Sequence, residues 1–320
     1  MFNKYLKTIL NGGIPEQEIR PREDGLAAYE AGEFQRAHPL LLKALETDPF
    51  AVDVLLALGR IDMSSEQFEK AEAWLKRAHD VDVRHALVNY LLGELAVRQE
   101  RLPEAAGYFT RAVQSDPDYT DAYIRLGMVH QQAQRGDEAI KAFERAIFLD
   151  RSAVVARFHL AEVCVAQGDV RRALTQLHLV KEIHGDYPPI FVLQGEIQFG
   201  LGDFRQAVLE FERAIALGID HADIQAHLSQ AHAHLGNREA ALQAALRSLE
   251  HDPARHALRL QVAEWLEQTH RLAQARAHYA SLAETEPHAA HAQEALLRLD
   301  ERLAQIAASM AGNDDAEGLH

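Results

Sequence analysis

The sequence has one cysteine, few prolines and glycines, and no long apolar run. The single cysteine, Cys164, excludes an internal disulfide and is typical of a protein from a reducing compartment. Ten prolines and 18 glycines in 320 residues favour long helices over an all-β fold. No uninterrupted apolar stretch approaches the roughly 20 residues that cross a bilayer. These absences predict a helical protein with neither a membrane-spanning helix nor disulfides.

Positive charge is also scarce. The chain has 33 Lys and Arg against 48 Asp and Glu, which gives a net charge of −15. Such a balance excludes broad binding to nucleic-acid phosphates. In the first ten residues, Lys4 and Lys7 interrupt the apolar residues, and no small-residue cleavage site follows. A secretory signal needs both features that are missing here, so we expect a cytoplasmic protein.

What the sequence does have is a repeat of 34 residues. The stretch FERAI occurs at 143–147 and again at 211–215, and FTRAV occurs at 109–113. Steps of 34 from Ala37 reach alanine every time up to Ala275, and the same steps from Gly25 always reach Gly, Ala or Ser. A fixed period of this length indicates an array of similar structural units.

Each unit contains two amphipathic segments of about 14 residues with helical spacing. A turn recurs between them at Gly32, Gly168, Gly202 and Gly236, where glycine suits the left-handed residue that ends a helix. Prolines in DPF, DPD, DPA and EPH mark the boundaries between units, because proline fits only the first turn of a helix. The small residues predict close approach of the paired helices, with large residues filling the adjacent space, such as Leu75, Phe109, Phe143, Leu177, Phe211 and Tyr279.

This pattern resembles the tetratricopeptide repeat (TPR), with its small residue in the first helix and its alanine followed by a large residue in the second. The resemblance implies an all-α fold, a right-handed TPR solenoid of eight helix-turn-helix repeats. Departures are Ala245, where a large residue is usual, and four replacements of the closing proline. The repeats are expected at 18–51, 52–85, 86–119, 120–153, 154–187, 188–221, 222–255 and 256–289.

The two ends differ from the repeats. Residues 1–17 form an amphipathic N-terminal segment, which would cap the first repeat, dock on a neighbouring copy or touch a membrane. Residues 290–310 have apolar residues at helical spacing and predict a C-terminal capping helix, which such an array needs. Residues 311–320 form an acidic tail that we expect to be disordered.

No motif for catalysis or cofactor binding appears in the sequence. There is no phosphate-binding glycine loop, nucleophile elbow or paired-cysteine metal site. We interpret the 18 histidines as scattered surface residues and Cys164 as a packed core thiol. The sequence therefore predicts a protein that is not an enzyme and has no cofactor and no metal.

The TPR resemblance also implies a concave groove lined by the first helices. Mapped onto this sequence, four of seven pairs in that groove are an apolar residue followed by an acid. We expect a protein or peptide partner with apolar and basic residues. The groove residues are Leu56, Arg60, Tyr90, Glu94, Ile124, Met128, Phe158, Glu162, Val192, Glu196, Phe199, Gln230, Leu260 and Glu264.

The sequence thus predicts a non-enzymatic scaffold that organises a multiprotein assembly. One alternative is an accessory TPR subunit of an envelope-polysaccharide or glycosyltransferase complex. Another is a self-assembling organelle coat, because residues 24–37 and 48–59 are similar to the opening repeats of magnetosome-associated TPR scaffolds. That alternative implies homo-oligomers through the N-terminal segment and a location at the surface of a membrane or organelle.

Overall fold

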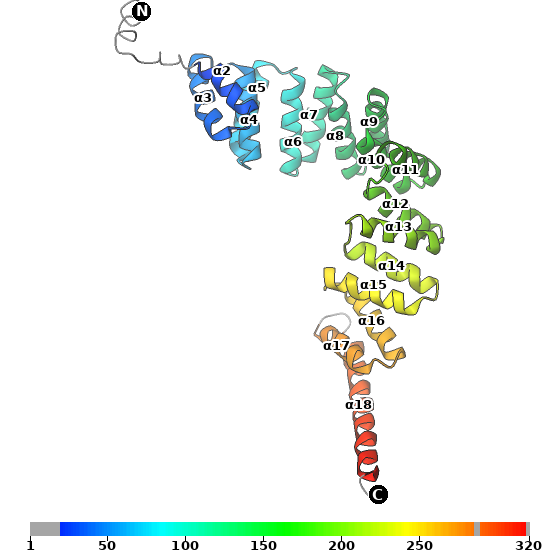
Figure 1. The fold of residues 1–320 in the computed structure, drawn as a ribbon. Helices are drawn as coiled ribbons and strands as arrows, with labels where there is room; N and C mark the ends of the chain where they lie inside the picture. Colours follow the sequence, from blue (N-terminus) through cyan, green and yellow to red (C-terminus); the bar gives the residue numbers. More distant parts are fainter. Residues whose placement is uncertain (1–19, 285–288, 318–320) are drawn as a thin grey trace, which may run out of the picture. The chain divides into compact units, whose positions relative to one another are not determined.

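The computed structural model describes residues 20–284 and 289–317, with side chains as far as 308. Within these ranges all regular structure is helical, and 17 helices follow one another along the chain (Figure 1). The helices are α2 (Pro21–Glu30), α3 (Phe34–Thr47), α4 (Val52–Ser64), α5 (Phe68–Val81), α6 (Ala86–Arg98), α7 (Leu102–Ser115), α8 (Thr120–Gln132), α9 (Gly136–Leu149), α10 (Val154–Ala166), α11 (Val170–His184), α12 (Pro189–Gly200), α13 (Phe204–Ala216), α14 (Ala222–His234), α15 (Arg238–His251), α16 (His256–Gln268), α17 (Leu272–Ala283) and α18 (Ala289–Glu317). The predicted N-terminal segment, 1–17, lies outside the described residues.

The helices form pairs, and each predicted repeat range contains one pair. We call the even-numbered helices α2 to α16 first helices and the odd-numbered helices α3 to α17 second helices. The chain divides into two compact units, Met1–Val163 and Cys164–His320, which we call unit 1 and unit 2. The division falls inside α10, so the fifth helix pair contributes to both units.

The small residues of the repeat allow each helix pair to pack closely. A Cβ atom added to Gly127 would lie 2.5 Å from the Phe143 ring, and one added to Gly195 would lie 2.6 Å from the Phe211 ring. Both distances are shorter than any real contact, so only glycine fits there. The alanines at the 34-residue steps from Ala37 to Ala275 are all completely buried. The predicted packing of small against large residues is confirmed.

The turn inside each repeat needs one residue with a left-handed backbone. Gly32, Gly168, Gly202 and Gly236 have φ between 76° and 82°, as predicted. The equivalent residues of the other four repeats adopt the same conformation without being glycine: Glu66, Glu100, Gln134 and His270 have φ between 56° and 59°. The turn is therefore fixed by the packing of the helix pair, and these four residues bear the steric cost of a left-handed conformation.

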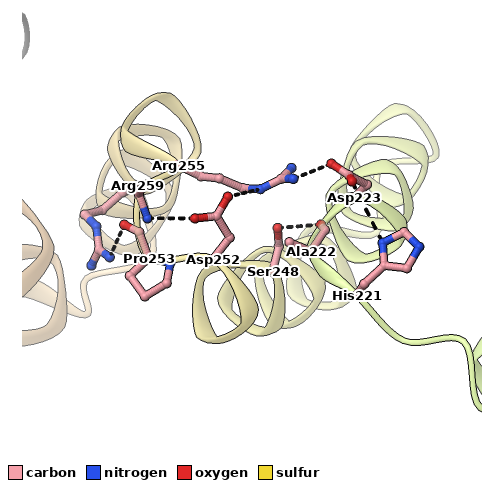
Figure 2. Close-up of polar contacts among 9 residues, drawn as sticks. His221, Ala222, Asp223, Ser248, Asp252, Pro253, Arg255 and Arg259 are labelled. Carbon is pink, nitrogen blue, oxygen red and sulfur yellow. Dashed lines mark hydrogen bonds and ion pairs between the residues drawn. The ribbon is translucent and has the colours of Figure 1, made fainter. Parts of the chain in front are cut away.

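Polar contacts join successive repeats in unit 2 (Figure 2). Arg255, just before α16, donates to Asp252 at 3.2 Å and also binds Asp223 on α14. The Ser248 hydroxyl on α15 donates to the backbone carbonyl of Ala222 at 2.7 Å. The Asp223 contact lowers the pKa of that carboxyl and raises the pKa of Arg255. These contacts join three consecutive helices, α14, α15 and α16.

The boundary at HGDYPP, residues 184–189, departs from the regular repeat. Helix α11 ends before Gly185, which has φ of 59°, and α12 begins at Pro189. Asp186 in this connection pairs with Arg213 of α13 at 2.8 Å. The same Arg213 guanidinium lies 4.4 Å from the centre of the Phe191 ring. These contacts tie the connection to the helices of unit 2.

Two features differ from the sequence-based expectations. Pro39 lies inside α3 and not in its first turn, so the helix tolerates the loss of one backbone hydrogen bond. Helix α18 continues to Glu317, whereas a disordered tail was expected from residue 311. The sequence from Ala304 to Ala311 is rich in alanine, and extending an existing helix costs far less free energy than starting one. Residues 318–320 lie outside the described part of the chain.

Candidate functional site

The residues predicted to line a groove lie on the first helices, and we call this set the first-helix face. In unit 1, α2 contacts α4 and α4 contacts α6; in unit 2, α12 contacts α14. These first helices therefore lie beside one another, and the predicted residues belong to the first helices α4 to α16. Each unit carries its own part of the face: eight residues, from Leu56 to Glu162, in unit 1 and six, from Val192 to Glu264, in unit 2.

Most of the predicted residues are accessible from solvent. Arg60, Glu196, Gln230 and Glu264 are exposed, and the other members except one are partly buried. The exception is Leu56, which is only 8% exposed and belongs to the hydrophobic core of unit 1. Its selection as a surface residue is wrong. The spacing places it at the edge of the apolar stripe of α4, where neighbouring core residues cover it.

Glu94 in unit 1 already has a cationic partner within the chain. Its carboxylate lies 3.0 Å from Nε of Arg125 on α8. Burial raises the pKa of Glu94, and the nearby Arg125 only partly offsets this. The Tyr90 ring, one turn before Glu94, lies 5.1 Å from the Tyr119 ring and 5.7 Å from the Phe109 ring. This part of the face is an aromatic surface beside an ion pair.

Glu162 is also held by neighbours within unit 1. It accepts a hydrogen bond from Gln131 at 3.0 Å and contacts Nδ1 of His159 at 2.7 Å. The His159 ring stacks on Phe143, with 5.8 Å between ring centres. Burial raises the pKa of the Glu162 carboxyl, but the hydrogen bonds from His159 and Gln131 outweigh it, and the pKa lies below its usual value.

These contacts change the expected partner chemistry in unit 1. Glu94 and Glu162 were expected to attract basic residues of a partner. Their charges are instead compensated by Arg125 and by the hydrogen bonds of His159 and Gln131. What unit 1 offers a partner is chiefly the half-buried apolar row Tyr90, Ile124, Met128 and Phe158.

The first-helix face of unit 2 carries aromatic rings in place of these polar contacts. The Phe199 ring at the end of α12 lies 5.3 Å from Phe204 and 5.6 Å from His227. His234 stacks on Phe204 with 4.1 Å between ring centres and an angle of 2° between the rings. We call Phe199, Phe204, His227 and His234 the aromatic cluster. Of these four residues, only Phe199 was predicted from the sequence to belong to the site.

Two histidines, His159 and His227, are partly buried, which differs from the expectation that the histidines are scattered surface residues. His227 is partly buried and stacks on Phe211 with 5.7 Å between ring centres. Burial lowers the pKa of His227, and the nearby Asp223 only partly offsets this. His159 occupies the equivalent position two repeats earlier. Each of these imidazoles takes a fixed position because the large residue of the preceding second helix lies beneath it.

The C-terminal end of unit 2 has an open cleft of about 380 Å³ between α16, α17 and α18. Its charged groups largely pair with one another: Arg298 binds Glu267 at 2.9 Å, and Glu264 lies 3.8 Å from His291. The Tyr279 hydroxyl donates to Glu267 at 3.3 Å, and burial raises the pKa of this tyrosine to about 12. The cleft is thus a polar contact surface between the last repeat and the capping helix.

In residues 20–284 and 289–317, no group of three or more His, Cys, Asp and Glu side chains is placed to hold a metal ion. No helix of the described chain is long and apolar enough to cross a membrane. Cys164 is buried, 1% exposed, which confirms its assignment to the core.

The chain is similar to several solved structures. A crystal structure of MamA is 26% identical, covering 51% of this chain and 95% of that one with a TM-score of 0.48. PilF from Pseudomonas aeruginosa is 23% identical over 61% of this chain and 88% of its own, with a TM-score of 0.53. The APC/C hetero-tetramer Cut9–Hcn1 contains a chain 20% identical over 86% of this one and 54% of its own, with a TM-score of 0.56. No curated protein sequence matches this chain.

Models of the tetratricopeptide repeat match residues 28–95, 96–156 and 192–256. Together these matches cover more than half of the chain. They fall on the helix pairs in which the small-to-large packing and the left-handed turns were found. The chain belongs to the tetratricopeptide repeat family.

Proposed function

We propose that this protein is a non-enzymatic interaction scaffold whose first-helix face binds a peptide segment of a partner protein. The observation that supports the proposal most strongly is the row of half-buried apolar side chains in unit 1, namely Tyr90, Ile124, Met128 and Phe158. Tyr90, Ile124 and Phe158 occupy the same place in three successive repeats, and Met128 lies one turn after Ile124. An extended or helical segment would contact these residues in order. Binding along several repeats would let one chain organise a multiprotein assembly.

Affinity purification with matched variants tests this proposal. The tagged chain is compared with Ile124→Glu/Met128→Glu, which places two charges in the apolar row. The control is Phe148→Glu on α9, because Phe148 is 72% exposed and is not part of the first-helix face. We expect mass spectrometry to show partners that are retained by the control and lost by the double variant. Thermal unfolding of both variants verifies the fold. Equal capture by all three proteins would contradict the proposal.

The same experiment distinguishes the two alternatives. Recovery of one stoichiometric enzyme through the face supports an accessory subunit of an enzyme complex. Recovery of a second, differently tagged copy of this chain as the main product supports a self-assembling coat. Turnover of a substrate by the isolated chain would overturn the non-enzymatic assignment.

A further inference from the structure

The aromatic cluster of unit 2 brings together four rings from three helices, at the edge of the first-helix face. Phe199 lies in the last turn of α12, Phe204 begins α13, and His227 and His234 lie on α14. The Phe199 ring is steeply inclined to the stacked pair, at 71° to both Phe204 and His234. The rings therefore present surfaces in two directions, as is needed to contact a side chain on more than one side.

The cluster is accessible. Phe199, Phe204 and His227 are partly buried, while His234 and the neighbouring Gln230 are exposed. Gln230 lies one turn after His227 on α14, and its amide oxygen is a hydrogen-bond acceptor. A group that enters the cluster would meet aromatic faces first and a polar acceptor beside them.

The charge around the cluster favours a cation. Glu196 is exposed on α12 about one turn before Phe199, on the same side of the helix, and it also has a contact within the chain. The whole chain has a net charge of −15. Burial lowers the pKa of His227, Asp223 partly offsets this, and Arg255 and His221 make smaller lowering contributions, so the neutral imidazole is favoured. Aromatic faces themselves attract cations.

We propose that the aromatic cluster binds an arginine side chain of the partner, stacked on the Phe199 and His234 rings and near Glu196 and Gln230. The inference rests on the proposed function and specifies the partner chemistry of unit 2. Arginine suits this site better than lysine, because its planar guanidinium stacks on rings and donates hydrogen bonds in several directions. A lysine ammonium group is more strongly hydrated and lacks a stacking face.

Histidine ring signals of the full chain report on this site directly. The ¹H–¹³C spectrum at pH 7.5 is followed during titration with N-acetyl-arginine amide, N-acetyl-lysine amide and N-acetyl-citrulline amide. Citrulline has the shape of arginine without its charge. We expect saturable shifts of the His227 and His234 signals with the arginine compound, weaker binding of the lysine compound and none of citrulline. No saturable change with arginine, or equal binding of arginine and lysine, would overturn the proposal.

Variants separate stacking from general attraction to an acidic chain. Phe199→Leu keeps an apolar side chain but removes the ring, so we expect binding to weaken by about two- to fivefold. Glu196→Gln should also weaken it, and Phe148→Leu, which alters an exposed phenylalanine in unit 1, should leave it unchanged. If Phe199→Leu binds arginine as the unchanged chain does, the assignment of the cluster is wrong.

Failure here is distinct from failure of the scaffold proposal. If arginine caused no saturable shift of the histidine signals, while partner capture depended on Ile124 and Met128, only the arginine proposal would be wrong. If arginine bound at the cluster but the Ile124→Glu/Met128→Glu variant captured partners as the unchanged chain does, the arginine site would stand. The proposed role of the unit 1 face would then be wrong.

Discussion

His159 in unit 1 and His227 in unit 2 occupy the same place in the repeat, 68 residues apart, yet have different surroundings. Each stacks on the phenylalanine of the preceding second helix, Phe143 or Phe211, at nearly the same distance. His159 contacts the carboxylate of Glu162 at 2.7 Å. At the place of that carboxylate, three residues after His227, the sequence has Gln230.

The comparison shows which parts of the repeat are constant and which vary. The glycine, alanine and phenylalanine positions fix where each imidazole lies. The residues that surround it are set by positions outside the core, such as Gln131 in unit 1 and the equivalent Phe199 in unit 2. The helix pairs thus provide one backbone for two kinds of surface, one with hydrogen-bonded polar groups and one with stacked rings.

The largest expected effect comes from forcing the seventh repeat to resemble the fourth. Ala245 occupies the place of Phe143, and the buried Ser229 occupies the place of Gly127. Ala245→Phe should lower the free energy of unfolding by about 3 kcal/mol, because Ser229 leaves no room for a ring. The Ser229→Gly/Ala245→Phe double variant should recover much of this loss. Denaturant unfolding measures both, and additive effects of the two substitutions would refute the compensation.

Gly127→Ala and Gly195→Ala test whether the two units share the same close packing. Each added Cβ atom would clash with a phenylalanine ring, so we expect a loss of about 1–3 kcal/mol in both. Gly107→Ala on α7 is the matched control, because nothing lies within 4 Å of the added atom. That variant should gain about 0.5–1 kcal/mol from helix propensity. If only one of the two variants lost stability, the close packing of the helix pairs would differ between the two units.

Gln230→Glu gives His227 the acidic neighbour that His159 has. We expect the pKa of His227 to rise, as measured by titration of its ring signals. In the present chain the lowered pKa means that the unfolded state binds this proton more readily, so stability falls as pH drops below the ordinary value near 6.5. The substitution should reduce that loss between pH 7 and 5. An unchanged pKa would mean that the two imidazoles are not equivalent in geometry. Gln230→Leu is the uncharged control.

The smallest expected effects lie in the turns. Gln134 in unit 1 and Gly202 in unit 2 occupy equivalent left-handed positions, with φ of 58° and 79°. Gln134→Gly should stabilise the chain by up to about 1 kcal/mol, and Gly202→Gln should destabilise it by a similar amount. Thermal unfolding checks both, and an effect of the same sign in the two variants would contradict this account.

The sequence predicts the helix pairs of this protein and their packing well. Small residues recur at 34-residue steps, from Ala37 to Ala275 and from Gly25 onward. They are needed for contacts between the two helices of one repeat, which are close to each other in the sequence. The left-handed turns at Glu66, Glu100, Gln134 and His270 were not predicted, because the prediction of a left-handed residue was based on glycine alone. The helix pairs on both sides impose the same backbone without it.

The candidate site is predicted less well from sequence. Leu56 was chosen by spacing alone, although its burial depends on how the core of unit 1 closes around α4. The pairing of Glu94 with Arg125, 31 residues away, joins two neighbouring repeats. A pattern read one repeat at a time does not contain that contact. Comparison of the sixth and twelfth residues of successive repeats would have drawn attention to Arg125, His159, His227 and Gln131.

The exact 34-residue period has a consequence for how a ligand finds its position. If every repeat carried the same face residues, an extended ligand could shift by one repeat and make identical contacts, so it would be bound in several registers. Glu94 and Glu162 in unit 1 occupy equivalent places in the repeat but have different partners, Arg125 for Glu94 and His159 with Gln131 for Glu162. A ligand that matched both of these surroundings in unit 1 would be bound in a single register and a single direction.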